Sequence, residues 1–443
     1  MTTNNYEIET QNGGLREAIS SLDENDLVGF ALELAKIESP PGHDAEMARI
    51  FHMGMRNRGI DSFLQPVSPG QYNVIGTYEG TGGGRTLMFN GHLHSCRVPF
   101  TEAEEAYGFK DLFSVQDARI VDGKWIYGDG IANMKGSLAA YVAAVRAIKD
   151  AGVELAGDVV ISGVVGTDEF SPVAQLQGAE HQGFGVGVKH LITHGGVADM
   201  CVVGEPTGLK LVTQHFGATR VRIDVVKEYS KMRSCNDVEE DFSEWIRSDS
   251  IAQLSKIVEA VRAWIPDYQK RNTIDGAVPA ITFLSIEGGQ PTRPPISPFI
   301  CSIFVDVRTR PDVLPISVKD EIRKVVSSVD LGKNFRVRVE LYATVPGPSV
   351  PVGSPLVAAL HAAHSDFFAK PVDLATVQWY SDAAHINRYG IPSINYGPGG
   401  GKRRPGSSLF EGEHINIGDL VDCTKVYIDL ILRLCGTVVF DGQ

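Results

Sequence analysis

The sequence has 443 residues, of which 43% are hydrophobic and 21% are charged, a composition that indicates a folded chain of two or three domains and excludes a disordered or fibrous protein. Its 41 Lys and Arg against 54 Asp and Glu give a formal charge of -13, which argues against nucleic acid or an anionic membrane surface as a partner. The six cysteines show no CxxC spacing, and no apolar run approaches about 18 residues. We therefore expect a cytoplasmic protein that acts on small molecules.

The first part of the chain alternates helical and strand-like patterns, which predicts a helix-flanked, mainly parallel sheet of the α/β class. Helices are expected at 26–37 and 45–58, and strands at 73–79 and 86–90. Ligands of open α/β sheets bind at the carboxyl ends of the strands. His92, which comes just after the second of these strands, is therefore a candidate site residue.

Acidic residues follow two further buried-strand patterns. One strand pattern leads into Glu169 and the next leads into Glu205. Asn133 stands at the beginning of a helix that we expect at 134–151. Its position fits either a helix cap or a ligand in the same site, because Asn is a good capping residue.

The middle of the chain predicts strand, helix, strand, strand, helix and strand in that order, the βαββαβ pattern of a ferredoxin-like α+β domain. The expected elements span 219–226, 251–264, 280–287, 300–307, 317–326 and 335–343. The α/β pattern resumes afterwards with a helix and a strand. We therefore expect residues 214–346 to form a domain inserted between 1–213 and 347–443, the two parts of a catalytic domain.

Five short motifs occur at or near the expected strand ends in a fixed order. They are Gly91-His92-Leu93-His94, Asn133-Met134-Lys135-Gly136, Asp168-Glu169, Gly204-Glu205-Pro206-Thr207 and the late Glu413. In order and spacing they resemble the cocatalytic metallopeptidases that include aminoacylase, carboxypeptidase G, acetylornithine deacetylase and succinyl-diaminopimelate desuccinylase. The resemblance covers nearly the whole chain. It implies a metal-dependent hydrolase whose inserted domain is a lid that joins subunits into a homo-oligomer.

The resemblance assigns roles to individual positions. His92 and Glu205 match the ligands of one metal ion, and Glu169 matches the general base that activates water. His94 stands where the family has an Asp that orients the metal-binding His, and Asp129 stands where it usually has Arg. Each is a candidate replacement for a lost ligand or orienting group.

Three positions depart from the family pattern. Asn133 replaces a bridging Asp, Phe170 replaces a second Glu, and Leu409 replaces a late His. Because these losses fall on the bridge and on one metal ion only, we expect one divalent ion per chain, held by His92, Glu205 and Asn133. Such a donor set suits Mn(II) or Zn(II).

The expected lid and the segment after it also depart from the family. The lid segment after the first strand lacks the His that stabilises an oxyanion in the family. Arg293 takes a position where relatives usually carry a substrate-contacting Asn, which predicts a bidentate clamp for an anionic substrate. Trp379 and Tyr380 replace a small Gly-Gly pair and predict an aromatic pocket for a flat substrate. The alternative is that these aromatic residues fill the space of the absent metal ion.

These features predict metal-dependent hydrolysis of a C–N bond in a small, anionic and aromatic substrate. The favoured reaction is hydrolytic deamination of an electron-poor aromatic amine, because the ring itself then takes up the developing negative charge. One alternative is the hydrolysis of an N-acyl amino acid or peptide. Another is a catalytically silent binding protein, against which the retention of Glu169 argues.

Overall fold

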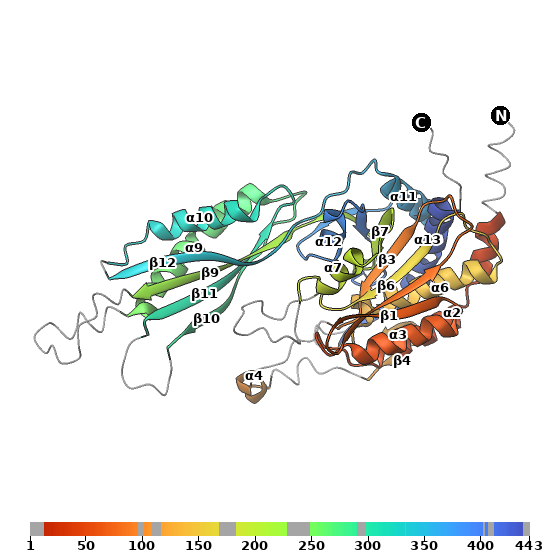
Figure 1. Ribbon diagram of the computed structural model, residues 1–443, viewed down its shortest axis with the longest axis horizontal. Helices are drawn as coiled ribbons and strands as arrows, with labels where there is room; N and C mark the ends of the chain where they lie inside the picture. The colour runs from red at the N-terminus through yellow and green to blue at the C-terminus, as the bar shows by residue number, and fades with distance from the viewer. Residues whose placement is uncertain are drawn as a thin grey trace, which may run out of the picture. The chain divides into compact units, whose positions relative to one another are not determined.

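The computed structural model describes residues 13–95, 102–108, 117–167, 183–227, 249–289, 298–332, 334–401, 404–405 and 412–436. The chain divides into two compact units, whose elements are labelled in Figure 1. Unit 1 comprises Met1–Gln214, Pro348–Ala375 and Ser381–Gln443, and unit 2 comprises His215–Gly347 and Thr376–Tyr380. The predicted limits placed residues 376–380 in the catalytic domain, whereas these residues belong to unit 2. Among the described residues, no helix combines the length and the apolar character that a membrane span requires.

Unit 1 is built on an eight-stranded sheet in the order β1-β2-β6-β3-β7-β14-β8-β13. The strands are β1 (Asp61–Ser68), β2 (Gln71–Tyr78), β3 (Leu87–His92), β6 (Val159–Val164), β7 (Met200–Val203), β8 (Leu211–His215), β13 (Leu374–Val377) and β14 (Ser393–Asn395). Three neighbouring pairs, β6/β3, β3/β7 and β7/β14, are parallel, whereas β1/β2, β2/β6 and β14/β8 are antiparallel. The sheet is therefore mixed and not mainly parallel as predicted. A tight hairpin joins β1 to β2 and needs no crossover helix.

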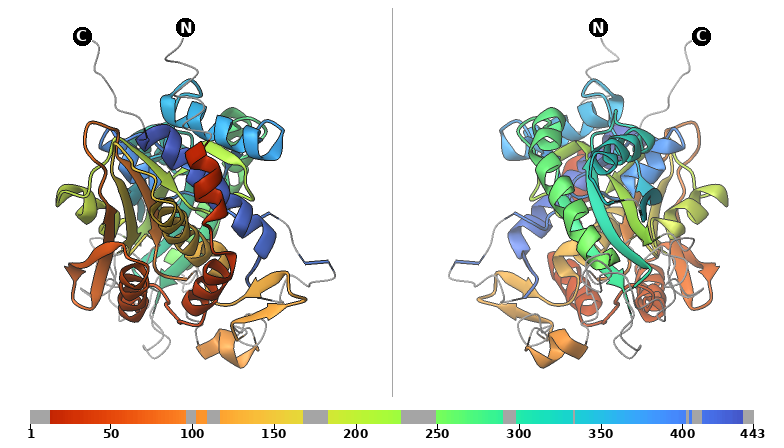
Figure 2. Two further views of the ribbon diagram at one scale, coloured as in Figure 1. Left: turned by 90° about the vertical axis from the view of Figure 1, so that its right-hand side faces the viewer. Right: turned by 90° about the vertical axis from the view of Figure 1, so that its left-hand side faces the viewer.

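Helices cover both faces of this sheet (Figure 2). One face carries α2 (Glu24–Ala35), α3 (Ala45–Asn57), α6 (Gly136–Asp150), α11 (Pro355–Phe368) and α13 (Ile417–Cys435), and the other carries α7 (Val186–Thr193) and α12 (Ala383–Arg388). Successive residues of β3 alternate between these faces: Leu87 and Phe89 belong to the first core and Met88 to the second. The short elements are α4 (Glu102–Ala106), the π-helical turn η1 (Ile131–Lys135) and a three-stranded sheet of β15 (His414–Asn416), β5 (Trp125–Tyr127) and β4 (Arg119–Val121).

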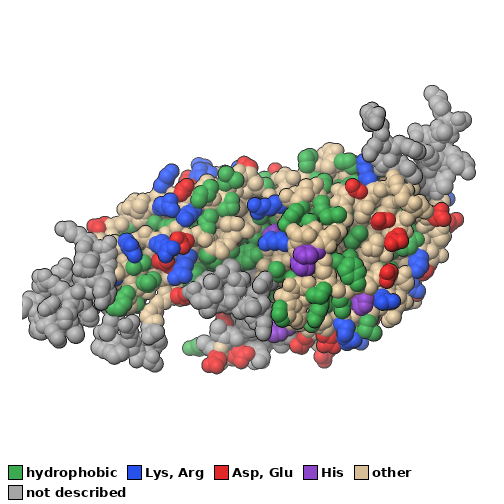
Figure 3. All heavy atoms as spheres, viewed as in Figure 1, with side chains coloured by type: hydrophobic (Ala, Val, Ile, Leu, Met, Phe, Trp, Pro, Cys, Tyr) green, Lys and Arg blue, Asp and Glu red, His purple; other side chains and the backbone are tan. Residues whose placement is uncertain are grey.

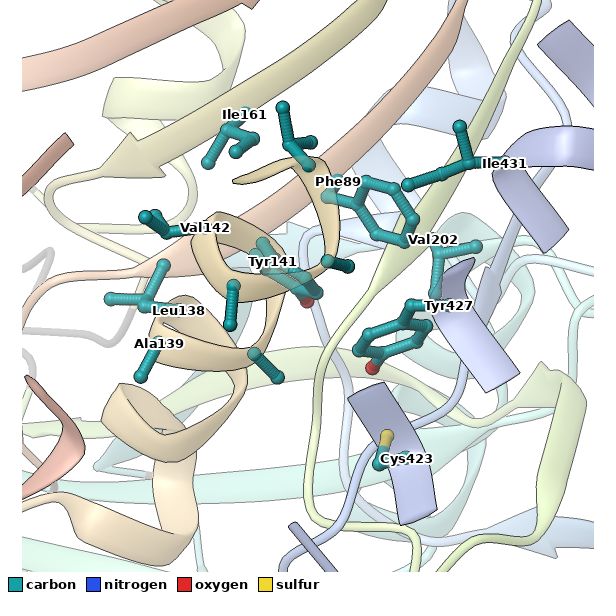
Figure 4. Packing of buried hydrophobic residues seen from close by; sticks show 14 of the residues in the cluster. Phe89, Leu138, Ala139, Tyr141, Val142, Ile161, Val202, Cys423, Tyr427 and Ile431 are labelled. Carbon is teal, nitrogen blue, oxygen red and sulfur yellow. The ribbon is translucent and has the colours of Figure 1, made fainter. Parts of the chain in front are cut away.

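The core of the first face is centred on aromatic side chains from β3, α6 and α13, as Figure 4 shows. The Phe89 ring lies 4.8 Å from the Tyr141 ring and 5.0 Å from the Tyr427 ring, measured between centroids. The Tyr141 and Tyr427 rings are 5.3 Å apart. Tilted and edge contacts at these distances add to the stability that burial of the rings provides. They fix α6 and α13 against the strand that ends at His92.

Unit 2 has a four-stranded antiparallel sheet in the order β10-β11-β9-β12 with two helices packed against it. In chain order its elements are β9 (Gly217–Lys227), α9 (Ser250–Asn272), β10 (Ile281–Gly288), β11 (Ile300–Thr309), α10 (Pro315–Ser327) and β12 (Phe335–Val345). Their order is the predicted βαββαβ order. Helix α9 continues beyond the predicted end at residue 264 and contains Pro266 in its interior. Basic and acidic side chains are intermixed on the described surface shown in Figure 3.

Candidate functional site

The first two candidate residues lie at the ends of adjacent parallel strands. Asn90 of β3 is paired with Val203 of β7; His92 is the last residue of β3, and Glu205 comes two residues after the end of β7. Both side chains lie largely inside the protein, at 3% and 6% exposure. Because the strands run in the same direction, His92 and Glu205 reach the same carboxyl edge of the sheet, where ligands of α/β proteins bind.

The main chain of a neighbouring residue orients the His92 ring. Its Nδ1 lies 2.7 Å from the backbone oxygen of His94, and a carbonyl oxygen only accepts hydrogen bonds. The proton of a neutral His92 ring is therefore on Nδ1, which leaves a lone pair on Nε2. The His94 ring stacks on the His92 ring at 4.1 Å. The backbone oxygen and the ring of His94 thus both contact the His92 ring, as groups behind metal-binding His residues commonly do. Its role as a replacement for the orienting Asp stays a prediction.

Asn133 lies directly against His92. Its Oδ1 is 3.1 Å from Nε2 of His92; with the ring neutral and its proton on Nδ1, both of these atoms carry lone pairs. The helix-cap alternative for Asn133 is wrong, because the residue that precedes α6 is Lys135 and Asn133 has the non-helical angles φ -131° and ψ 87°. Two acceptor atoms that face each other are what we expect of two ligands of one cation.

The turn that carries Asn133 is held by the carboxylate of Glu413, to which the sequence analysis assigned no role. Glu413 accepts hydrogen bonds from the backbone N–H groups of Asn133 at 2.6 Å and Gly130 at 3.0 Å. Burial raises the pKa of Glu413 to about 7, against the lowering effect of the Asn133 hydrogen bond. Glu413 is 280 positions from Asn133 in the sequence, so that no local pattern could predict their contact. Its place in the late motif was the only feature that pointed to the site.

Asp129 forms a buried ion pair with Lys135. Its carboxylate lies 3.3 Å from Nζ of Lys135, and the side chains of both residues are at most 4% exposed. It also accepts a hydrogen bond from the Ser39 backbone N–H at 3.3 Å. These contacts tie the turn that carries Asn133 to the loop after α2, which is a structural task.

Close packing behind Glu205 fixes its strand end. The Ser137 hydroxyl donates to the Gly204 carbonyl at 2.6 Å, and the Tyr141 hydroxyl donates to the Asn90 carbonyl at 3.0 Å. A Cβ atom on Gly204 would lie 2.0 Å from the Tyr141 hydroxyl. Only glycine fits at this position, so that helix α6 approaches the backbone next to Glu205 directly.

Several predicted site residues lie outside the described residues: the expected base Glu169, its neighbours Asp168 and Phe170, the expected clamp Arg293, and Leu409. Their expected roles stay predictions. Among the residues that the structure does describe, no three His, Cys, Asp or Glu side chains gather as a metal site. His92, Asn133 and Glu205 still fit a divalent cation, because imidazole, amide and carboxylate donors suit Mn(II) and Zn(II).

Trp379 and Tyr380 belong to unit 2, where each lies beside a polar side chain. The Trp379 ring is 6.0 Å from the ring of His215, and the guanidinium of Arg308 lies over the Tyr380 ring at 5.1 Å. Burial lowers the pKa of His215 to about 4, so that this ring is neutral at pH 7. The predicted role of Trp379 and Tyr380 in an aromatic substrate pocket stays a prediction, and their contacts with His215 and Arg308 were not expected from the sequence.

The sheet and the polar side chains at the carboxyl ends of its parallel strands define an α/β protein with a candidate ligand site at that edge. The family model of peptidase family M20/M25/M40 matches residues 97–433, and the chain belongs to this family. It is therefore a hydrolase of C–N bonds, as predicted at the level of the family.

Three known proteins illustrate these similarities. An N-formyl-4-amino-5-aminomethyl-2-methylpyrimidine deformylase of Bacillus subtilis (strain 168) is 24% identical over 430 residues, which are 90% of this chain and 91% of the relative. The crystal structure of aminopeptidase PepT from Bacillus cereus ATCC 10987 has a TM-score of 0.65 at 17% identity and covers 94% of this chain and 99% of its own. The YXEP protein of Bacillus subtilis, a dinuclear metal binding peptidase, has a TM-score of 0.60 at 12% identity and covers 92% and 96%.

Proposed function

We propose that this chain is a divalent-metal-dependent amidohydrolase that cleaves the C–N bond of an N-acyl or N-formyl amine. The observation that carries the proposal is the 3.1 Å approach of His92 Nε2 to Asn133 Oδ1, beside the strand end that leads to Glu205. Two relatives support it, since one is a deformylase and another is a dinuclear metal binding peptidase. The amide reaction, the alternative in the sequence analysis, therefore replaces aromatic deamination as the favoured one.

In this proposal His92, Glu205 and Asn133 hold one Mn(II) or Zn(II) ion. When bound, such an ion acts as a Lewis acid on the carbonyl group. The Glu169 carboxylate takes a proton from the attacking water and passes it to the leaving nitrogen. The Arg293 guanidinium binds an anionic group of the substrate in a bidentate manner.

A second candidate is the hydrolytic deamination of an electron-poor aromatic amine, and the departures from the family pattern resemble 5-nitroanthranilate aminohydrolase. Two contacts in unit 2 favour it: Trp379 beside the neutral His215 ring, and Tyr380 beneath the Arg308 guanidinium. Aromatic side chains next to a guanidinium suit a flat anionic ring. In that reaction the ring and its nitro group take up the negative charge, so that no oxyanion-binding His is needed.

We further propose that unit 2 is a lid that joins copies of this chain into a homo-oligomer, as the resemblance implies. Its edge strand β10 exposes Leu284 at 44% and Ile286 at 65%. An apolar edge strand of this kind readily pairs with another chain.

The two candidate reactions release different products, and this allows a direct test. We expect protein loaded with Mn(II) or Zn(II) to deacylate N-formyl or N-acyl amines, which an assay for newly formed primary amine detects. The same protein is incubated with nitro-substituted and unsubstituted anthranilates, and ammonia is measured. Ammonia from the nitro compound without deacylation would replace the first candidate by the second. Metal-loaded protein that is inactive in both assays would contradict both.

The metal content is expected to be about one ion per chain at saturation, because Phe170 and Leu409 cannot serve as ligands. Elemental analysis after dialysis against Mn(II) or Zn(II) measures this ratio. As a matched control, His92→Ala removes the imidazole ligand and is expected to lose the tightly bound ion. Two tightly bound ions per chain would show that the chain keeps a dinuclear site.

A further inference from the structure

A buried carboxylate outside the proposed ligand set joins two strand ends of unit 1. Asp382 stands at the beginning of α12 and is 1% exposed. Its Oδ2 accepts a hydrogen bond from the Thr167 hydroxyl at 2.7 Å and another from the Asn90 side-chain amide at 3.2 Å. Thr167 follows β6 and Asn90 lies in β3, so that one oxygen atom links two parts of the sheet.

Asn90 extends this link to the third strand. Its Oδ1 accepts from the Ser162 hydroxyl of β6 at 2.8 Å. Its backbone oxygen accepts from the Gly204 N–H at 3.2 Å, one residue before Glu205. The side chain of Asn90 thus contacts Asp382 and β6, and its backbone contacts the segment after β7.

Every segment that Asp382 connects continues into a proposed functional residue. Asn90 is two positions before His92, Gly204 is one position before Glu205, and Thr167 is two positions before Glu169. A carboxylate oxygen can accept both of these hydrogen bonds at once. In a buried setting, connected hydrogen bonds of this kind hold the groups that they join in one geometry.

We propose that Asp382 is a positioning residue for the metal site, which sets the spacing between the strand end that carries His92 and the end of β6 at Thr167. This inference rests on the proposed function, because it concerns the geometry of the same site. Asp382 acts through Asn90 and Thr167, whose hydrogen bonds hold the ends of β3 and of the segment after β6.

The test measures the Zn(II) dissociation constant by competition with a chromophoric chelator, together with the midpoint of thermal unfolding. We expect Asp382→Asn to weaken Zn(II) binding by about tenfold or more, because the charged acceptor of both hydrogen bonds is lost. Thr167→Val removes one hydroxyl at constant size and is expected to weaken it by about threefold. Thr167→Ser keeps the hydroxyl and is expected to bind Zn(II) like the wild type.

A matched control separates positioning from stability. Thr424→Val also removes a buried hydroxyl, which donates to the Leu420 carbonyl within α13 at 2.8 Å. It is expected to lower the unfolding midpoint without changing the Zn(II) dissociation constant. If Asp382→Asn does not fold, the positioning role is tested by the Zn(II) dissociation constants of Thr167→Val, Thr167→Ser and Thr424→Val.

The outcomes distinguish this inference from the proposed function. Wild-type protein that binds Zn(II), with Asp382→Asn and Thr167→Val binding it equally well, would overturn the positioning role and leave the metal site in place. Equal losses of Zn(II) affinity in Thr167→Val and Thr167→Ser would overturn the positioning role as well. Wild-type protein that binds neither Zn(II) nor Mn(II) would overturn the proposed function and the positioning role together.

Discussion

Replacement of Glu169 by Gln is expected to lower the turnover number by about 100-fold or more, while the unfolding midpoint and the metal content stay those of the wild type. Gln keeps the size and the hydrogen-bonding shape of Glu but cannot take a proton from water at neutral pH. General-base catalysis commonly contributes a factor of this size. Steady-state kinetics with the acylated amine that the wild type hydrolyses best measures the effect.

The matched control is Asp168→Asn, which removes the same charge one residue earlier in the chain. We expect it to lose less activity than Glu169→Gln, because the proposal gives Asp168 no proton to transfer. Equal turnover in Glu169→Gln and wild type would mean that the assignment of the base is wrong. A loss of bound metal in Glu169→Gln would instead identify Glu169 as a ligand.

Asp44 is expected to make the stability of the fold depend on pH. Its side chain is 0% exposed, and neither carboxylate oxygen has a hydrogen-bond partner among the residues that the structure describes. Burial raises the pKa of Asp44 from 3.8 to about 7. The folded chain therefore holds this proton more tightly than the unfolded chain. The resulting stability is complete below about pH 4 and is lost as the pH rises to about 7.

Asp44→Asn removes this titration. Relative to the wild type, the variant is expected to gain on the order of 4 kcal/mol in free energy of unfolding between pH 4 and pH 7, since one pKa unit corresponds to about 1.4 kcal/mol. Urea denaturation of both proteins at pH 4, 5.5 and 7 measures the difference. A difference that does not change with pH would disprove the role of Asp44.

Asp26→Asn is a control of opposite sign. Burial raises the pKa of Asp26, but the Arg58 and Arg146 guanidinium groups together outweigh this effect and lower the pKa below its usual value. Its contribution to stability is present above the unfolded pKa of about 3.8 and is lost as the pH falls through the lower pKa of the folded state. Asp26→Asn should therefore be less stable than the wild type at pH 7, by an amount that shrinks toward acid pH.

The strands that lead to the site were predictable because they are buried on both faces and consist of continuous apolar runs. All six residues of β3 and all six of β6 are buried. Short apolar runs of this kind are typical of strands that are covered on both faces of a sheet. The edge strand β1 was not predicted, because it contains Pro66 and exposes Phe63 at 55%. Proline and an exposed aromatic residue weaken the alternation that identifies a strand.

The contacts within the site were less predictable than the strands, because they join distant parts of the chain. Asn90 and Asp382 are 292 positions apart, and no local pattern connects them. The cap interpretation of Asn133 used only the residues next to it. The hydrogen bond to Glu413 and the contact with His92 lie outside any such window.

The place of β14 in the sheet has a consequence for the order in which the nascent chain can fold. Strand β7 pairs with β3 along one side and with β14 along the other, and β14 begins only at Ser393. During synthesis from the N-terminus, β7 therefore keeps an unpaired apolar edge while about 190 further residues are added. At typical elongation rates of about 5–20 residues per second, this interval lasts on the order of 10–40 seconds. A ribosome-bound chain that stops before Ser393 should consequently need a chaperone, because an open apolar strand edge is a site of aggregation.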